Sequence, residues 1–165
     1  MRVILVRHGK ASKDPKYASD ENRPLTGRGK AEVTALAEWL GRAGITVHQI
    51  RHSGLLRAQQ TADIFAKQIK PAGGVVAVRG LLFDDPVDEL ARELALETEP
   101  VMLVGHNPFM ERLAAALLRA DAAQPPVWFG TGSTACFDLV EGFWTVKWVL
   151  HRELTGANNK DKGNA

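Results

Sequence analysis

Short apolar runs alternate with amphipathic helical patterns along most of the chain, and this alternation constrains the fold more than any other feature. Residues 3–6 and 101–104 are apolar at every position, as expected of parallel strands buried on both faces of a sheet. Residues 26–42 and 55–69 instead repeat apolar residues at helical spacing. The alternation predicts an α/β fold with three α/β/α layers, in which helices flank a mostly parallel central sheet.

The same pattern divides the chain into elements and predicts a single domain over residues 1–154. Predicted strands cover residues 2–7, 47–52, 75–78, 101–104, 134–140 and 144–151, and predicted helices cover residues 26–42, 55–69, 86–94 and 108–118. We expect the last two strands to form a hairpin around Glu141 and Gly142. Residues 155–165 are polar and rich in Gly, Asn and Lys, which predicts a disordered tail. The segments between the elements are too short for a large cap insertion over the sheet.

Charge and composition argue against several classes of function. The 165 residues include 21 Lys and Arg against 19 Asp and Glu, and this net charge of +2 is too small for a typical nucleic-acid-binding protein. No apolar run approaches the length of a membrane span, so we expect neither a membrane anchor nor a signal peptide. The one cysteine, Cys136, cannot form an internal disulfide and suits a reducing compartment. We therefore expect a cytoplasmic protein.

Two of the buried runs lead directly into a histidine. His8 follows the first strand, and His106 follows the strand at residues 101–104. Ligands of open α/β sheets bind outside the carboxyl ends of the strands, so both histidines are expected at the edge that holds the site. Arg7 precedes His8, and Arg57 falls in the first turn of the helix after the second predicted strand.

Together these two histidines and two arginines predict a cationic pocket that suits a phosphoryl group. A tetrahedral phosphate has several oxygens that need donors, and planar guanidinium groups supply donors in fixed geometry. A histidine placed in line can attack phosphorus and form a phosphohistidine that water later hydrolyses. Neighbouring arginines disfavour the imidazolium form, which helps to keep such a histidine neutral and nucleophilic.

Several motifs in a fixed order resemble the signature of the histidine phosphatase superfamily, which has the phosphoglycerate-mutase-like fold. They are Arg7-His8-Gly9, then Pro24-Leu25-Thr26 with Gly29, then residues 53–62 (SGLLRAQQTA) and residues 104–108 (VGHNP). The small size of the chain, the run at residues 23–26 and the stretch at residues 129–133 before a late strand further resemble the SixA-type phosphohistidine phosphatases.

The resemblance implies a role for each matched residue. It implies that His8 is the nucleophile that accepts the phosphoryl group, that Arg7 and Arg57 clamp that group, and that His106 contacts its oxygens. It also implies a phosphohistidine phosphatase that works without a cofactor or metal, on a phosphorylated histidine of another protein, through a covalent intermediate on His8. An open pocket would admit such a protein substrate.

Three further residues are candidates for substrate binding. Gly9 belongs to the first motif. Arg23 either reaches the phosphate or a partner, or forms an ion pair within its loop. Ser53 either forms a hydrogen bond in the site or caps the following helix, and the cap is favoured.

The proton donor is a separate question. Larger relatives carry a glutamate donor in an inserted segment, and this sequence offers no equivalent. An alkyl phosphate ester needs such an acid, whereas a phosphoramidate leaves as neutral imidazole once its ring is protonated. Asp84 and Asp85 are the only acid candidates, and a role as acidic residues near a helix N-terminus is favoured for both.

Two other functions remain open at this point. The same residues would serve a broad phosphatase for small phosphate esters, and an inactive pocket would serve a non-catalytic phosphoryl-binding module. A metal site formed by His8, His106 and His52 is disfavoured, because two arginines in the same pocket would repel a cation.

Overall fold

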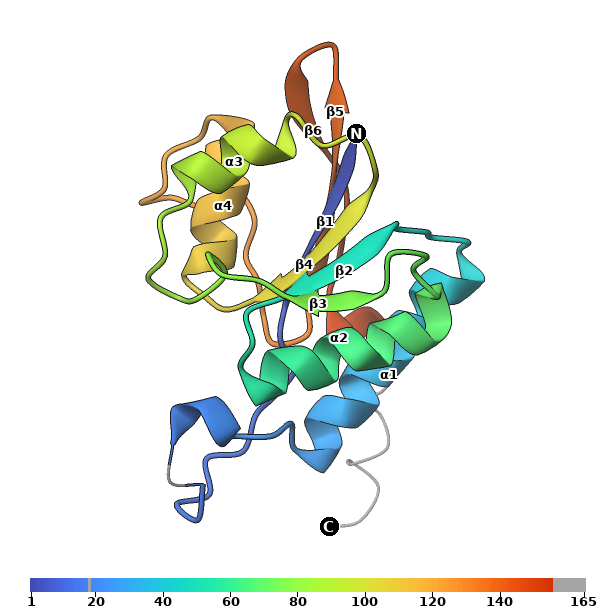
Figure 1. Ribbon diagram of the computed structural model, residues 1–165, viewed down its shortest axis with the longest axis vertical. Coiled ribbons are helices and arrows are strands. Elements are labelled where there is room, and N and C mark those ends of the chain that lie inside the picture. The colour runs from blue at the N-terminus through green and yellow to red at the C-terminus, as the bar shows by residue number, and fades with distance from the viewer. Residues whose placement is uncertain (18, 156–165) are drawn as a thin grey trace.

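A six-stranded sheet forms the centre of the protein, with strand order β3-β2-β4-β1-β5-β6 (Figure 1). The computed structural model describes residues 1–17 and 19–155. The strands are β1 (Arg2–Arg7), β2 (Gln49–His52), β3 (Val75–Ala77), β4 (Val101–Gly105), β5 (Thr134–Val140) and β6 (Phe143–Leu150). Strands β3, β2, β4 and β1 pair in parallel, and β5 pairs antiparallel with both β1 and β6. The mostly parallel sheet predicted from the sequence is confirmed.

Helices cover both faces of this sheet, which gives the three predicted layers (Figure 1). They are α1 (Gly27–Arg42), α2 (Leu56–Ile69), α3 (Asp88–Leu94) and α4 (Phe109–Leu118), with the short 3-10 helices η1 (Asp20–Asn22) and η2 (Arg152–Thr155). Strand β1 shows how the layers are built. Val3 and Leu5 pack with α3 and α4, whereas Ile4 and Val6 pack with α1 and α2. Successive side chains of a strand point to opposite faces, so one apolar run supplies two cores.

Helix α1 begins where the sequence predicts. The Thr26 side chain accepts a hydrogen bond from the Gly29 amide at 2.9 Å, which satisfies one of the unpaired amides at a helix N-terminus. Val33, Leu36 and Leu40 are fully buried along one face of the helix. The cap and the apolar face together fix the start of α1 close to the carboxyl end of β1.

The last described element of the chain, η2, contacts α1. Strands β5 and β6 are joined at Glu141 and Gly142, whose φ angles of 51° and 83° form the tight turn expected of a two-residue hairpin. Helix η2 then packs against α1. The predicted tail begins one residue too early, because Thr155 ends η2 and donates a hydrogen bond from Oγ1 to the Arg152 carbonyl at 2.7 Å. Residues 156–165 of that predicted tail lie outside the described residues.

The structure also bears on the single cysteine and on the length of the apolar segments. Cys136 is fully buried in β5, and burial raises the pKa of its thiol to about 11, so it is a small neutral core residue. In the described part of the chain, no helix has both the length and the apolar character needed to cross a membrane.

Candidate active site

The carboxyl ends of β1 and β4 bring the two strand-end histidines together. The His8 amide donates to the Gly105 carbonyl at 3.0 Å, and the His8 carbonyl accepts from the Gly132 amide at 3.1 Å. These backbone bonds fix His8 between β4 and the loop that leads into β5. The ring centroids of His8 and His106 are 4.9 Å apart. The predicted meeting of the two histidines at one sheet edge is therefore found.

Tight packing behind His8 fixes its position further. A Cβ atom on Gly9 would lie 2.6 Å from Cγ2 of Val33 in α1, so only glycine allows the chain to pass this close. The Gly9 amide donates to Oγ1 of Thr61 at 3.1 Å, and Thr61 donates to the Arg57 carbonyl at 2.7 Å. The buried Thr61 hydroxyl thus links the loop after β1 to the turn of α2 that carries Arg57.

The hydrogen bond of the His8 ring determines which nitrogen is available. Nδ1 lies 2.7 Å from the Gly9 carbonyl oxygen, which can only accept, so Nδ1 carries the proton. In the neutral ring, Nε2 then has a free lone pair. Burial, with smaller contributions from His106, Arg57 and Arg7 that repel the charged form, lowers the pKa of His8 to about 3. The His8 ring is therefore neutral at physiological pH, with its lone pair on Nε2.

His106 is also held neutral. Its Nε2 lies 2.7 Å from Oγ of Ser53, and burial, with a smaller contribution from Arg57, lowers its pKa to about 4. The favoured interpretation of Ser53 as a helix cap is wrong, because the N-cap position of α2 is Leu55 and no side chain caps it. Ser53 instead lies in the loop between β2 and α2, where its hydroxyl orients the second histidine.

The two arginines approach the histidines from different elements. Arg7, at the end of β1, donates from Nη1 to the Phe129 carbonyl at 2.7 Å, and burial lowers its pKa. Arg57, in the first turn of α2, has a side chain that is only 7% exposed. The loop before β5 thus holds Arg7, and it buries Phe129 while leaving Trp128 64% exposed.

The Arg57 guanidinium forms an ion pair with the carboxylate of Asp20, a residue that the sequence analysis did not identify. Asp20 of η1 accepts hydrogen bonds from Arg57 at its backbone carbonyl and at Oδ2, both at 2.7 Å. Its other carboxylate oxygen accepts from Nη1 of Arg23 at 2.6 Å. These bonds, that from Arg57 first, lower the pKa of Asp20 below its usual value. Arg23 therefore forms the loop ion pair that was one of its predicted roles.

A cavity of about 650 Å³ opens over His8. Seven of its twelve lining residues are cationic, and none of the twelve is acidic. The cationic residues are Arg7, Lys10, Lys13, Arg23, Arg28, Arg57 and Arg152. Such a lining attracts a phosphoryl dianion and repels a metal cation. Asp84 and Asp85 are not among the lining residues, and Asp85 instead accepts a hydrogen bond from the Leu82 amide at 2.7 Å.

Comparison with known proteins agrees with this geometry. The family model of the histidine phosphatase superfamily (branch 1) matches residues 3–81. Phosphohistidine phosphatase SixA of Escherichia coli K12 is 31% identical over 155 residues, which cover 91% of this chain and 93% of SixA. The chain belongs to the histidine phosphatase superfamily.

A solved structure and a further relative indicate which type of histidine phosphatase this chain resembles. The structure of the protein histidine phosphatase SixA complexed with tungstate matches it with a TM-score of 0.83 and 28% identity, over 93% of this chain and 99% of that chain. An uncharacterised protein of Picosynechococcus sp. is 36% identical over 121 residues, or 71% of this chain and 73% of its own length. The chain is thus a phosphatase that resembles the SixA type, and its predicted fold is confirmed.

Sequence reasoning missed three parts of the site of this histidine phosphatase. Thr61 lies within a matched motif, but nothing in the sequence shows that its hydroxyl meets Gly9. Asp20 lies in a loop without a periodic pattern. The carboxylate of Glu32 is 2% exposed, and it accepts hydrogen bonds from Arg28 and Arg152. Only Glu32 had a usable signal, because it lies one turn before Leu36 on the buried face of α1.

Proposed function

We propose that this histidine phosphatase removes phosphoryl groups from phosphohistidine in proteins, through a covalent phosphohistidine on its own His8. The observation that carries the proposal is the state of the His8 ring. Its Nδ1 proton is bound by the Gly9 carbonyl, which leaves the Nε2 lone pair available in a cationic cavity. The similarity to Escherichia coli SixA, a phosphohistidine phosphatase, supports the choice of substrate.

The proposed reaction has two steps. In the first, Nε2 of His8 attacks phosphorus while the P–N bond to the substrate imidazole breaks. The substrate ring first takes a proton from solvent on its other nitrogen, so the electron pair of the broken P–N bond leaves it as neutral imidazole. In the second step, water attacks phosphorus, the bond to Nε2 breaks, and the proton lost by the water leaves with inorganic phosphate or solvent. Arg7, Arg57 and His106 stabilise the charge on the phosphoryl oxygens in both steps.

The state of Asp20 supports a phosphoramidate rather than an alkyl ester. An alkoxide leaving group needs a protonated acid beside it. The hydrogen bonds from Arg57 and Arg23 lower the pKa of Asp20, so it is ionised at neutral pH and has no proton to give. A protonated imidazole leaving group has no such requirement.

The test compares the unmodified protein with His8→Ala and His48→Ala, without added metal, on a phosphohistidine protein and on a panel of small phosphate esters. His48 is exposed and does not line the cavity, so His48→Ala is a matched control. We expect a strong preference for phosphohistidine, and a loss of at least about 10³-fold in His8→Ala alone. Retained activity in His8→Ala would exclude His8 as the nucleophile. Preference for one ester would keep His8 and replace the substrate.

A further inference from the structure

The cavity extends well beyond the space that a phosphoryl group needs. Its volume of about 650 Å³ falls within the range of pockets that bind whole small molecules. Arg7 and Arg57 approach His8 and serve the phosphoryl group in the proposed function. Lys10, Arg28 and Arg152 line the same cavity and have no part in that reaction.

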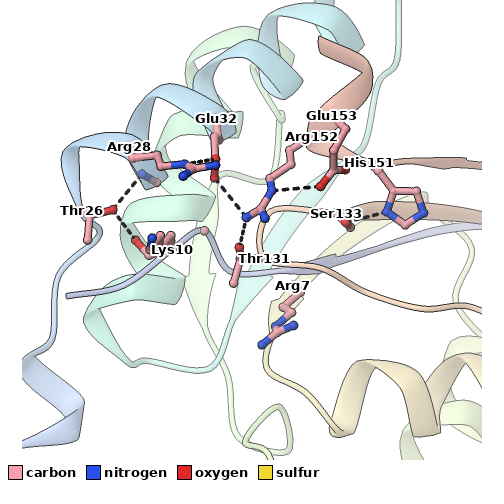
Figure 2. A network of polar contacts seen from close by, with 12 residues as sticks. Arg7, Lys10, Thr26, Arg28, Glu32, Thr131, Ser133, His151, Arg152 and Glu153 are labelled. Atoms are coloured by element: carbon pink, nitrogen blue, oxygen red, sulfur yellow. Dashed lines mark hydrogen bonds and ion pairs between the residues drawn. The ribbon is translucent and has the colours of Figure 1, made fainter. Parts of the chain in front are cut away.

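Three distant segments of the chain build this second part of the cavity (Figure 2). Glu32 of α1 accepts a hydrogen bond from Nε of Arg28 at 2.7 Å, and Nη1 of Arg152 lies 3.4 Å from its other carboxylate oxygen. Nη1 of Arg152 also donates to Oγ1 of Thr131, in the loop before β5. Figure 2 shows the two arginines reaching Glu32 from two sides, with Arg7 beyond Thr131. A buried carboxylate thus holds both guanidinium groups in place at the cavity.

A purely structural role does not account for this arrangement well. A buried ion pair is weak evidence of stabilisation, since desolvation of the charges offsets much of their attraction. Arg152 is also incompletely used. Its Nε donates to Glu153 and its Nη1 to Glu32 and Thr131, while Nη2 donates to none of the residues in the described ranges 1–17 and 19–155. A planar, oriented guanidinium with an unused edge is suited to an incoming carboxylate or phosphate.

We propose that Arg28 and Arg152, held by Glu32, form a second anion subsite that binds an additional negative group of the substrate beside the phosphohistidine. The proposal rests on the proposed function. In a protein substrate this group is the side chain of an Asp or Glu near the phosphorylated histidine. In a small phosphate ester it is a second phosphate or a carboxylate, and the chemistry of recognition is the same.

The experiment measures kcat/KM for two phosphohistidine peptides that differ only in the residues flanking the histidine, Asp in one and Asn in the other. We expect the unmodified protein to prefer the acidic peptide by about tenfold at low salt, and the preference to fall as ionic strength rises. Arg152→Gln and Arg28→Gln should each reduce the preference to about twofold or less. Arg42→Gln is the matched control, because Arg42 lies on α1 with an exposed side chain outside the cavity. It should keep the full preference.

The ratio between the two peptides separates recognition from stability. Loss of the partner of Glu32 could reduce the amount of folded protein, but that loss affects both peptides equally and cancels from the ratio. An equal fall of kcat/KM on both peptides in Arg152→Gln would overturn the proposal. So would an unmodified protein that does not distinguish the two peptides.

A second pair of substrates distinguishes this proposal from the proposed function. A small ester with one phosphate is compared with the same ester carrying a second phosphate. If no phosphohistidine peptide is cleaved but the esters are, the proposed function fails while the subsite is still tested. A preference for the bisphosphate that Arg152→Gln removes would then support the subsite, and an equal rate on both esters would overturn it.

Discussion

Two regions of the active-site cavity are built in different ways. The floor is His8, which lines the cavity, together with the residues packed behind it at the ends of β1 and β4, namely Gly9, Gly105 and His106, and it is fixed by backbone hydrogen bonds and close packing. The wall is formed by residues 10–17 and 19–28 together with Arg152, and ion pairs between side chains connect it to α1 and α2. Asp20 in the wall is 54% exposed, whereas His106 in the floor is 2% exposed.

This difference separates the chemistry from the selection of substrate. A backbone contact does not depend on side-chain identity, so the floor holds His8 in one position whatever the wall contains. Exposed ion pairs contribute little to stability, about 0–1 kcal/mol each. The pair between Arg23 and the half-exposed Asp20 can therefore be replaced by contacts to a charged substrate at small cost, whereas the pair of Arg152 with the buried Glu32 stays in place. We expect changes in the floor to alter the rate of the chemical step and changes in the wall to alter substrate affinity and preference.

Among the changes that compare the two regions without removing His8, the largest effect is expected from a methyl group added to the floor. In Gly9→Ala the new Cβ would lie 2.6 Å from Cγ2 of Val33, so the chain at His8 must shift. We expect a loss of about 10²-fold in kcat, since a misplacement of about 1 Å has that effect, and a loss of about 1–3 kcal/mol in the free energy of unfolding. Steady-state kinetics and urea denaturation measure the two quantities.

Gly27→Ala is the matched control for this change. Gly27 is the first residue of α1 and belongs to the wall, and no atom lies within 4 Å of the position of a Cβ there. Alanine at this position should leave kcat unchanged and stabilise the helix by at most about 1 kcal/mol. If both variants behaved alike, the contrast between a packed floor and an open wall would be wrong.

The floor was predictable from the sequence because its signal is local. Apolar runs define β1 and β4, the residue after each strand lies at the sheet edge, and parallel pairing brings His8 and His106 together. The resemblance to a known family then implied roles for Arg7 and Arg57. These roles stay predictions, although the structure places both arginines at the cavity.

The wall was not predictable, because its contacts join residues that no periodic pattern connects. Glu32 and Arg152 are 120 residues apart in the chain, and they meet because η2 packs against α1. Asp20 belongs to η1, and its partner Arg57 lies 37 residues further along the chain. The preference for Ser53 as a helix cap failed for the same reason, since its partner His106 lies 53 residues further along the chain.

The second prediction concerns how the free energy of unfolding depends on pH. In the floor, burial lowers the pKa of His8 to about 3 and that of His106 to about 4, against an ordinary value of about 6.5. Between these values and pH 6.5 the unfolded chain binds protons that the folded protein does not, so the free energy of unfolding falls as the pH falls. Each ring contributes a slope of at most about 1.4 kcal/mol per pH unit. Urea denaturation between pH 7 and pH 4.5 measures the slope.

Two variants test whether the pH dependence of the free energy of unfolding arises from the buried histidines of the floor. His106→Asn should have a shallower slope than the unmodified protein, because one of the buried rings is gone. Asp20→Asn should keep the original slope in this range, because the pKa of Asp20 in the wall lies below 3.8 and its contribution is lost only at lower pH. An unchanged slope in His106→Asn would show that the acid sensitivity comes from elsewhere in the molecule.

The smallest effect is expected from the wall. Oδ2 of Asp20 accepts a hydrogen bond from the Arg57 guanidinium. An incoming phosphoryl group must therefore displace this carboxylate or share Arg57 with it. Asp20→Asn removes the competing charge, so inorganic phosphate should inhibit more strongly, by about two- to fivefold at low salt and less at high salt, with kcat almost unchanged. Glu21→Gln is the control, because Glu21 is an exposed neighbour in η1 that does not line the cavity. Weaker inhibition by phosphate in Asp20→Asn would mean that Asp20 orients Arg57 rather than competes for it, and the wall would then share the positioning role of the floor.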